Sequence, residues 1–534
     1  MIESAIQNSV LLFCGLIAVV LLFLGIGDMP LYILDEAKNA ECAREMWMRQ
    51  DWIVPTFNEV LRMDKPPLHY FAMMLAYSIF EVSAFSARFF SAVMGLLTLF
   101  AVYYYSKQIF GKSVAVWAVF VLLASLHFLF QFHLAVPDPY LITCITIAVF
   151  AFHSGLEREN NWQLLLAYTT TALGTLAKGP IALGLVGLIM LLYLIFSRQL
   201  NWRRLVKLQI PLGAIWFCGL TLPWYIAVGK ATNGEWLKGF FFTHNFSRFT
   251  DAMESHGGGF WMTFLYVFMG MLPFILFLPQ ALNKLYKAHY HDFGKRGEGK
   301  NSSTRFLLLV SIAAAVIIGF FAISTTKLPN YTVPAYPFLA VLLAYYLSDI
   351  QRTHLVSLLF HFFLATALVA GIYFGIATYE LLADFEYLAF LFLPMLIGAT
   401  ISLVFHFKQL AKQSIRSILF GNIITAVLLF SIALPKVFQQ NPVLQSLHLI
   451  EKEQNIITYR LFNPAYLFNL ERTLKNTRSR PALKKYLQDN PKAPLLTQER
   501  YLKDMKYLSF EFDTLFLQQD LFEKQKTVIL KRRQ

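Results

Sequence analysis

The sequence predicts an α-helical polytopic membrane protein with a small α/β domain at its C-terminal end. Of 534 residues, 57% are hydrophobic and only 15% are charged, whereas about a quarter of a typical soluble chain is charged. Aromatic residues make up 16% of the chain, with 51 phenylalanines, which suits lipid-facing and interfacial positions. The apolar runs are too long and continuous for an outer-membrane barrel, whose strands alternate over about ten residues.

Helices that cross a membrane need about 20 apolar residues. The first such run, Ala5 to Ile26, has no basic segment before it and no small-residue cleavage site, so we expect a retained helix. The breaks at Lys178-Gly179-Pro180 and at Pro137-Asp138-Pro139 each separate two closely spaced spans. The predicted spans, about thirteen in all, lie near residues 5–27, 85–106, 114–133, 138–155, 163–178, 180–197, 206–229, 260–282, 305–325, 331–349, 354–376, 385–406 and 416–435.

The net charge of +14 indicates a positive-inside bias, not nucleic-acid binding. Lysine and arginine gather in some loops and not in others, as membrane orientation requires. The first extramembrane loop, about 28–83, then faces the opposite side, with the 137–139 turn, the 230–258 loop and the Lys327 turn. An odd number of spans puts the C-terminal tail on that side too. The loops assigned to the cytoplasm are 107–112, 198–207, 284–305 and 408–416.

The tail changes character, so we predict two domains, residues 1–435 in the membrane and residues 436–534 outside it. Thr514–Leu517 and Thr527–Leu530 alternate like strands, and Arg480–Leu487 reads as a helix. A segment of about 100 residues can bury a modest core of its own.

The most informative segment is the polar stretch from Asp35 to Lys65, because charge at a membrane boundary indicates function by default. Asp35 is either the N-cap of an interfacial helix or a carboxylate that acts as a general base or pairs with a cation. These two roles are compatible. Asp138, between two prolines, is either a turn residue or a second carboxylate at the same membrane depth.

Several cations are predicted at the same face. Pro66 and Pro67 fix the backbone after Lys65, which either holds its ammonium at constant height or snorkels as a helix anchor. Asp64 pairs either with Lys65 or with Arg62. Lys178 breaks an apolar run and is either a helix-end anchor or a site residue. The cations and hydrogen-bonding groups that suit a lipid phosphate are Lys65, Arg248, Lys327 and Tyr331, although each alone fits ordinary interfacial anchoring.

The sequence lacks the motifs of soluble nucleotide- and metal-dependent enzymes. It has no Walker A loop, no strand-directed Rossmann glycine fingerprint, no HExxH and no GxSxG. Its four cysteines are scattered, and three lie in apolar runs. We therefore predict no cofactor and no metal, so the energy for a reaction arrives in a lipid-linked substrate.

In order and rough spacing over about residues 10–350, the chain resembles GT-C membrane glycosyltransferases that use polyprenyl-phosphate sugars. These include the protein O-mannosyltransferases and, closer, the bacterial lipid A aminoarabinose transferases. The motifs that carry the resemblance are Asp35-Glu36, Ala40-Glu41, Arg44-Glu45-Met46, Asp51-Trp52-Ile53-Val54-Pro55, Asp64-Lys65-Pro66-Pro67-Leu68, Arg88-Phe89, Asp138, Leu176-Ala177-Lys178-Gly179-Pro180, Pro223-Trp224-Tyr225, His244-Asn245-Phe246-Ser247-Arg248-Phe249 and Lys327-Leu328-Pro329-Asn330-Tyr331-Thr332-Val333-Pro334.

The resemblance implies roles for individual residues. Asp35 matches the essential first-loop aspartate of the family, and Asp138 matches its second important carboxylate. Lys65, Arg248 and Tyr331 match positions that hold the carrier-lipid phosphate.

Other positions differ from the family pattern. Aminoarabinose transferases commonly have Arg-Tyr where this chain has Lys38-Asn39, and usually Glu where it has Asp64. We place Glu36 with the catalytic carboxylates, and Lys38, Asp64 and Lys178 near the sugar or acceptor.

The resemblance implies an enzyme of the bacterial inner membrane that transfers a sugar, with inversion, from undecaprenyl phosphate to a periplasmic acceptor. Lipid A is the favoured acceptor, and the alternatives are a protein or a surface polysaccharide. A flippase or transporter of lipid-linked substrates is disfavoured, because a transporter should carry its charges near the bilayer midplane.

Overall fold

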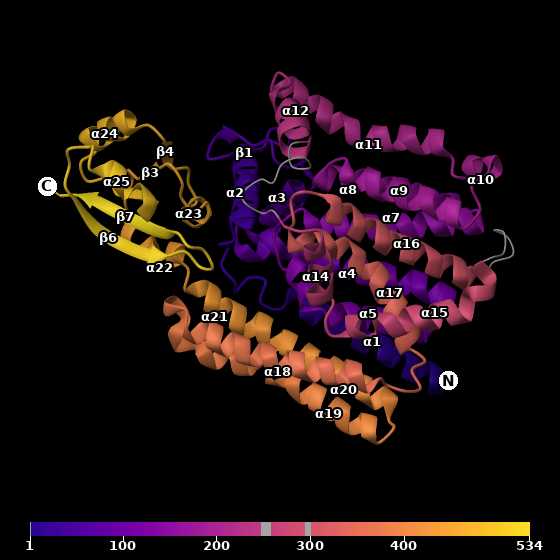
Figure 1. The fold of residues 1–534 in the computed structure, drawn as a ribbon. Coiled ribbons are helices and arrows are strands. Elements are labelled where there is room, and N and C mark those ends of the chain that lie inside the picture. The colour runs from indigo at the N-terminus through magenta and orange to yellow at the C-terminus, as the bar shows by residue number, and fades with distance from the viewer. Residues whose placement is uncertain (1, 247–257, 294–300, 534) are drawn as a thin grey trace.

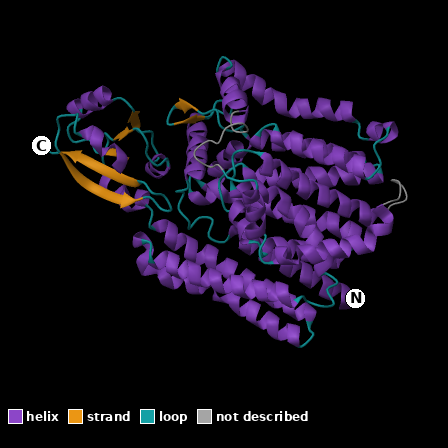
Figure 2. Ribbon diagram, viewed as in Figure 1, coloured by secondary structure: helices purple, strands orange, loops and turns teal. Residues whose placement is uncertain are grey.

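The computed structural model describes residues 2–246, 258–293 and 301–533, except for the side chains of 2–11, 243–246 and 288–293. A bundle of long helices carries a small strand-containing domain at one end (Figure 1, Figure 2). Among the residues that the structure describes, seven helices are long and apolar enough to cross a membrane, or up to nine if each of two bent pairs is one span. The predicted fold class is therefore confirmed, while the count of thirteen spans stays a prediction.

The helices of the bundle follow the predicted apolar runs closely. In chain order they are α1 (Ile2–Phe23), α4 (Ala84–Phe110), α5 (Lys112–Leu123), α6 (Leu126–Phe132), α7 (Asp138–Arg158), α8 (Asn161–Lys178), α9 (Ile181–Phe196), α10 (Trp202–Lys207), α11 (Ile210–Ala231), α12 (Glu235–Lys238), η1 (Gly239–Phe246), α14 (Trp261–Gly270), η3 (Phe274–Phe277), α15 (Leu278–Phe293), α16 (Ser302–Ile323), η5 (Pro329–Ala335), α17 (Tyr336–Leu347), α18 (Leu355–Ala377), η6 (Glu380–Phe392), α19 (Leu393–Phe407), α20 (Ala411–Leu428), η7 (Leu429–Ala433) and α21 (Leu434–Gln439).

Two runs predicted as single helices are broken. Residues 114–133 form α5 and α6, which meet at 75°, and the chain bends by 107° between α14 and the segment that starts at Phe274. The first break falls at Ser125, whose hydroxyl accepts from the amide of Phe128 at 3.1 Å and donates to the carbonyl of Gly270 at 2.5 Å. One hydroxyl thus caps α6 and bonds the end of α14, so the two breaks are joined.

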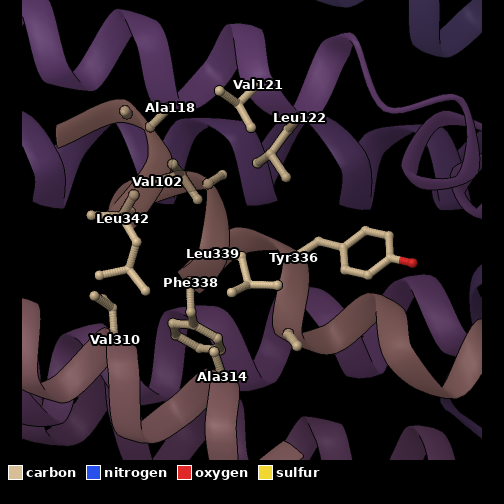
Figure 3. Close-up of a cluster of buried hydrophobic side chains, with 14 of the residues drawn as sticks. Val102, Ala118, Val121, Leu122, Val310, Ala314, Tyr336, Phe338, Leu339 and Leu342 are labelled. Atoms are coloured by element: carbon tan, nitrogen blue, oxygen red, sulfur yellow. The ribbon is translucent and has the colours of Figure 1, made fainter. Parts of the chain in front are cut away.

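The core of the bundle lies where α4, α5, α16 and α17 meet (Figure 3). Small side chains such as Ala118 and Ala314 lie among larger ones such as Leu122 and Phe338, and all four are fully or almost fully buried. The hydroxyl of Tyr336 points away from this cluster (Figure 3) and lies 2.9 Å from Nδ1 of His127.

The loops separate into two sets at opposite ends of the bundle. Helices α10 and α15 reach the end away from the strand domain, whereas α2 (Leu34–Arg49) and α3 (Leu68–Phe80) lie beside that domain (Figure 1). At the far end, Lys207 pairs with Glu159 at 2.5 Å. The basic loops therefore gather at one end and the polar first loop lies at the other.

The first loop begins with α2, whose N-cap position is occupied by Ile33 without a side-chain cap bond. Asp35 is thus not the N-cap, which corrects that interpretation. It lies in the first helical turn, where a carboxylate complements the positive end of the helix dipole. A short hairpin of β1 (Thr56–Phe57) and β2 (Val60–Leu61) then leads to α3.

The C-terminal domain is built on a five-stranded sheet of order β4-β3-β5-β7-β6. Strands β4, β3 and β5 are parallel, and β7 and β6 continue the sheet antiparallel. The predicted small α/β domain is confirmed, and the boundary after residue 435 stays a prediction. Its elements are α22 (Pro442–Ile450), β3 (Ile457–Tyr459), α23 (Ala465–Leu470), β4 (Lys475–Thr477), α24 (Arg480–Asp489), β5 (Leu495–Gln498), η8 (Glu499–Tyr501), α25 (Leu502–Met505), β6 (Phe512–Gln519) and β7 (Lys526–Arg532).

This domain is bound directly to the first loop and to the segment before it. Asn58 exchanges two hydrogen bonds with the backbone of Leu474, at 2.8 and 2.9 Å. Arg44 donates to the carbonyl of Glu471 at 2.9 Å. The amide of Leu521 donates to the hydroxyl of Tyr32 at 2.9 Å. The C-terminal domain therefore holds α2 and the hairpin in place.

Asp520 is the neighbour of Leu521, and its carboxyl makes the stability of the C-terminal domain depend on pH. Burial raises the pKa of its carboxyl to about 6, against the effect of the hydroxyl of Thr527, which donates to it at 2.6 Å. The ordinary value is about 3.9. The folded protein favours the protonated form of the Asp520 carboxyl. The stability that this protonated carboxyl contributes is therefore fully present below the ordinary pKa and is lost as the pH rises through 6.

We therefore expect Asp520→Asn to flatten the pH dependence of unfolding between pH 4 and 7 and to stabilise the protein above pH 7, by up to about 3 kcal/mol. Thermal unfolding of both proteins across this range measures the effect. Parallel curves for the two proteins would contradict the assignment to Asp520.

Candidate active site

Asp138 is the first residue of α7 and is almost fully buried. Its Oδ1 accepts hydrogen bonds from Nζ of Lys178 at 2.7 Å and from Nδ2 of Asn330 at 2.9 Å. Its other oxygen, Oδ2, takes part in neither contact. Two donors from different parts of the chain thus fix the carboxylate in one orientation.

The aromatic ring of Tyr331 extends this arrangement. The ammonium of Lys178 lies 5.0 Å from the centre of that ring, within the range of a cation–π contact. The ring also lies 4.9 Å from that of Phe321. Three segments meet here: the start of α7, the end of α8 and η5. We call Asp138, Lys178, Asn330 and Tyr331 the Asp138 cluster.

The first two turns of α2 are bound to the segment just before Asp138. Glu36 accepts from the amide of Ala135 at 2.8 Å, and Asn39 donates to the carbonyl of the same residue at 3.4 Å. Asp35 adjoins Glu36 and is exposed. The two predicted catalytic aspartates therefore lie on segments that contact each other.

Glu36 has no exposed surface, and its carboxylate forms a bidentate ion pair with Arg88, at 2.7 and 2.8 Å. The guanidinium also donates to the carbonyls of Ile26, Met29 and Pro30. With two bonds to Glu36 and three to carbonyls, all five N–H donors of Arg88 are used. This pair ties α2 and α4 to the segment that follows α1.

Arg62 organises the other side of α2. It donates to the carbonyl of Lys38 and, at 2.9 Å, to Oδ1 of Asn39. It also pairs with Asp64 at 3.5 Å, which is one of the two pairings that the sequence left open for that carboxylate. Burial alone would lower the pKa of Arg62, but neighbouring groups that include Asp64 and Asp35 raise it. Asp35 therefore lies within electrostatic reach of this guanidinium.

Lys65 comes directly after Asp64 in the chain, and its side chain is half-buried. Its chain segment is covered by α12 and η1. The indole of Trp236 donates to the carbonyl of Arg62 at 2.8 Å, and a Cβ added at Gly239 would clash with Sδ of Met63. The segment before Lys65 thus packs tightly against the start of the 230–258 loop.

Lys327 is buried, and its ammonium donates to the carbonyls of Ser324 and Ala322, the latter at 2.9 Å, at the end of α16. A cation is favourable at a helix C-terminus. Burial lowers its pKa. Gly258 lies beside it, since an added Cβ there would meet Cγ of Lys327 at 3.2 Å. Arg248, predicted to bind phosphate, lies outside the described residues.

The fold and this site define a multi-pass α-helical membrane protein with the architecture of GT-C glycosyltransferases. ArnT from Cupriavidus metallidurans in the apo state has a TM-score of 0.80 to the chain, with 20% identity and 98% of each chain covered. The same protein bound to undecaprenyl phosphate gives 0.78, with 19% identity and 98% of each chain covered.

Sequence comparisons point the same way. Residues 64–226 match the family model described as dolichyl-phosphate-mannose-protein mannosyltransferase. The undecaprenyl phosphate-alpha-4-amino-4-deoxy-L-arabinose arabinosyl transferase of Yersinia pestis (strain Pestoides F) is 28% identical over 345 residues, which are 63% of this chain and 58% of that protein. The protein of the same name from Enterobacter sp. (strain 638) is 29% identical over 324 residues, 60% of this chain and 56% of its own.

The match therefore spans less than two thirds of the length of these relatives. Within it, the resemblance predicted from the sequence, to ArnT-like GT-C glycosyltransferases, is confirmed.

Three residues that organise the site were not given roles from the sequence. Asn330 lies in the motif next to Tyr331, and an amide at a helix start carries no signal of its partner. Arg88 was noted only as part of a motif. Arg62 was considered only as a partner of Asp64. For Arg88 the available signal was an arginine inside a predicted span, where a charge needs a partner.

Proposed function

We propose that the chain is an inner-membrane glycosyltransferase that moves a sugar from undecaprenyl phosphate to a periplasmic acceptor, with lipid A as the favoured acceptor. The observation that carries this proposal is the Asp138 cluster beside the first turn of α2. It puts a fixed carboxylate, an ammonium and a tyrosine next to a helix that presents Asp35. The names of the relatives reported above support the undecaprenyl-phosphate donor.

The proposed orientation follows from the charge of the loops. The basic loops face the cytoplasm, and the first loop, the Asp138 cluster and the C-terminal domain face the periplasm. A flippase of lipid-linked substrates is disfavoured because the charged side chains of the first loop and of Lys178 gather at one end of the helices, not at their middle.

In the proposed reaction, an oxygen of the acceptor attacks the anomeric carbon of the sugar from the side opposite the lipid phosphate. The bond from that carbon to the phosphate oxygen breaks, its electron pair stays on the phosphate, and the configuration inverts. Lys65, Arg248 and Tyr331 would stabilise the charge that gathers on this leaving group, because preorganised cations and hydroxyls favour it in a dry site.

Asp35 would orient the acceptor, or take its proton if the acceptor group is a hydroxyl. A lipid A phosphate is already a nucleophile, so Asp35 would then only position it. Asp138 assists, with Lys178 and Asn330 holding its orientation. Glu36, without exposed surface, would act as a positioning residue that fixes the helix carrying Asp35. Lys38 and Asp64 would lie near the sugar or acceptor, and Lys327 would support the phosphate from the end of α16.

Mass spectrometry of lipid A from cells with and without this gene tests the acceptor. We expect the gene to add a sugar-sized mass to lipid A. In parallel, purified protein in nanodiscs with a sugar-loaded undecaprenyl phosphate should release undecaprenyl phosphate only when an acceptor is present. Unchanged lipid A together with donor turnover would move the acceptor to a protein or polysaccharide. Absence of donor turnover with every acceptor tested would contradict the enzyme class.

Asn330→Leu tests the geometry of the Asp138 cluster. It removes one of two donors to the carboxylate while keeping side-chain size. A hydrogen bond to a charged group contributes about 1.5–3 kcal/mol, so transfer should fall by about ten- to a hundredfold. Steady-state transfer in nanodiscs measures this. The control is Asn161→Leu, at the far end of α8, where the amide bonds Gln209 on the surface. Equal activity of both variants would argue against a role for Asn330.

A further inference from the structure

The C-terminal domain has the strand order that creates a ligand crevice in open α/β sheets. Strand β3 lies between β4 and β5, all three are parallel, and the chain reaches β4 before it returns across β3 to β5. The connecting helices α23 and α24 join different buried clusters, one that includes Tyr466 and one that includes Leu483. The strand order therefore reverses at β3, and ligands of such sheets bind beyond the carboxyl ends of the strands at this point.

Arginines occupy the carboxyl ends of all three parallel strands. Arg460 follows β3 directly, with a φ of +64°, Arg500 lies two residues after β5, and Arg480 begins α24 just after β4. Arg460 and Arg500 lie 5.1 and 5.0 Å from the centre of the Tyr501 ring. Chain segments far apart in sequence thus bring their guanidinium groups to one ring.

A buried carboxylate at the centre of the group fixes two of the three arginines. Asp504 pairs with Arg480 at 2.6 Å and with Arg460 at 3.4 Å, and accepts from the hydroxyl of Tyr459 at 2.9 Å. Burial by itself would raise the pKa of Asp504, but these hydrogen bonds and charges lower it. The carboxylate therefore orients the guanidinium groups and cancels one of their three charges.

The four charged groups sum to +2, and the arginine side chains remain partly exposed: 39% for Arg460 and 43% for Arg480. Arg500 is not bonded to Asp504 but to Oε1 of Gln498, at 2.7 and 3.0 Å. A phosphate monoester carries about −1.5 to −2 charge and three acceptor oxygens, and guanidinium groups match it with pairs of N–H donors.

We propose that the carboxyl edge of β4, β3 and β5 is a site that binds a phosphate group, either of a sugar-phosphate head group or of free phosphate, through Arg460, Arg480 and Arg500. It is separate from the Asp138 cluster, and it does not depend on sugar transfer. Strand β4 begins one residue after Leu474, which bonds Asn58 of the first loop. The carboxyl end of β4 is only roughly 10 Å further along the strand, at about 3.3 Å per residue. A group bound at that end would therefore be held near the first loop.

The test uses the full-length protein in nanodiscs of phosphatidylcholine and follows the ³¹P line width of glucosamine 1-phosphate as protein is added. We expect saturable broadening, and about tenfold weaker binding for Arg500→Gln, since one charged donor group is lost. The matched control is Lys492→Gln, an exposed site just before β5 and so at the opposite edge of the sheet, which should bind as the wild type does.

Arg500→Lys, which keeps the charge but loses the paired donors, should fall between the two, and thermal unfolding identifies any variant that fails to fold. Inorganic phosphate distinguishes the sources. Tighter binding of the sugar phosphate supports a head-group site, and equal affinity supports a site for the phosphate alone. No saturable broadening with either probe, or equal loss in Arg500→Gln and Lys492→Gln, would overturn the proposal, whatever the outcome of the transfer assays.

Discussion

Asp35→Asn is expected to lower sugar transfer by about 10²-fold or more while the protein still folds and binds its donor. The side chain keeps its shape but loses the charge that a general base or an orienting carboxylate needs, and general-base catalysis contributes about 10²- to 10⁴-fold. Because Asp35 is exposed in the first turn of α2 and does not cap that helix, its loss should change stability little. Transfer rate and donor binding, measured on the same nanodisc preparation, separate these effects.

The matched control is Asp28→Asn, an exposed carboxylate in the connection between α1 and α2, a few residues before Asp35. It should leave transfer unchanged. The pH dependence of the rate then distinguishes two roles for Asp35. If Asp35 removes a proton from a hydroxyl, the variant loses the acidic limb of the profile. If it only positions a phosphate, the rate falls with an unchanged profile. Wild-type transfer by Asp35→Asn would refute both.

Local sequence patterns predicted the bundle and the C-terminal domain because both depend on periodicity and length. The breaks in the bundle were missed for a physical reason. The 114–133 run is apolar throughout the bend, and one hydroxyl, that of Ser125, ends α5 and starts α6 through a bond to Gly270, which lies 145 positions away. The local sequence around Ser125 carries no pattern that would predict a bond to a residue so far along the chain.

The site, like the fold, has some features that the local sequence predicts and others that depend on distant contacts. Asp138 and Lys178 stood out because each interrupts an apolar context, and the structure brings them to 2.7 Å. Their meeting with Asn330 could not be predicted, because it depends on how η5 packs against the start of α7. Glu36 was placed with the catalytic carboxylates because it adjoins Asp35, but adjacent residues of a helix point about 100° apart. One reaches the surface, and the other is buried against Arg88.

That buried pair carries the largest expected effect on stability. Arg88→Met should destabilise the protein by about 3–5 kcal/mol, because removing one partner leaves the Glu36 carboxylate buried without its countercharge. It also leaves the carbonyls of Ile26, Met29 and Pro30 without this donor. We expect a large fall in the midpoint of thermal unfolding in detergent and a lower yield from the membrane. We also expect transfer activity to be lost, because α2, which carries Asp35, would be displaced.

A second substitution separates charge from packing. In Arg88→Met/Glu36→Gln the buried group is neutral, and its amide oxygen still accepts from the amide of Ala135, so part of the stability should return. Arg88→Lys keeps the charge but offers three donors in place of five, and should lie between wild type and Arg88→Met. A double variant no more stable than Arg88→Met would show that the loss arises from the carbonyls and packing. Wild-type stability in Arg88→Met would mean that the other contacts of α2, with Ala135, Arg62 and the C-terminal domain, are enough to hold it.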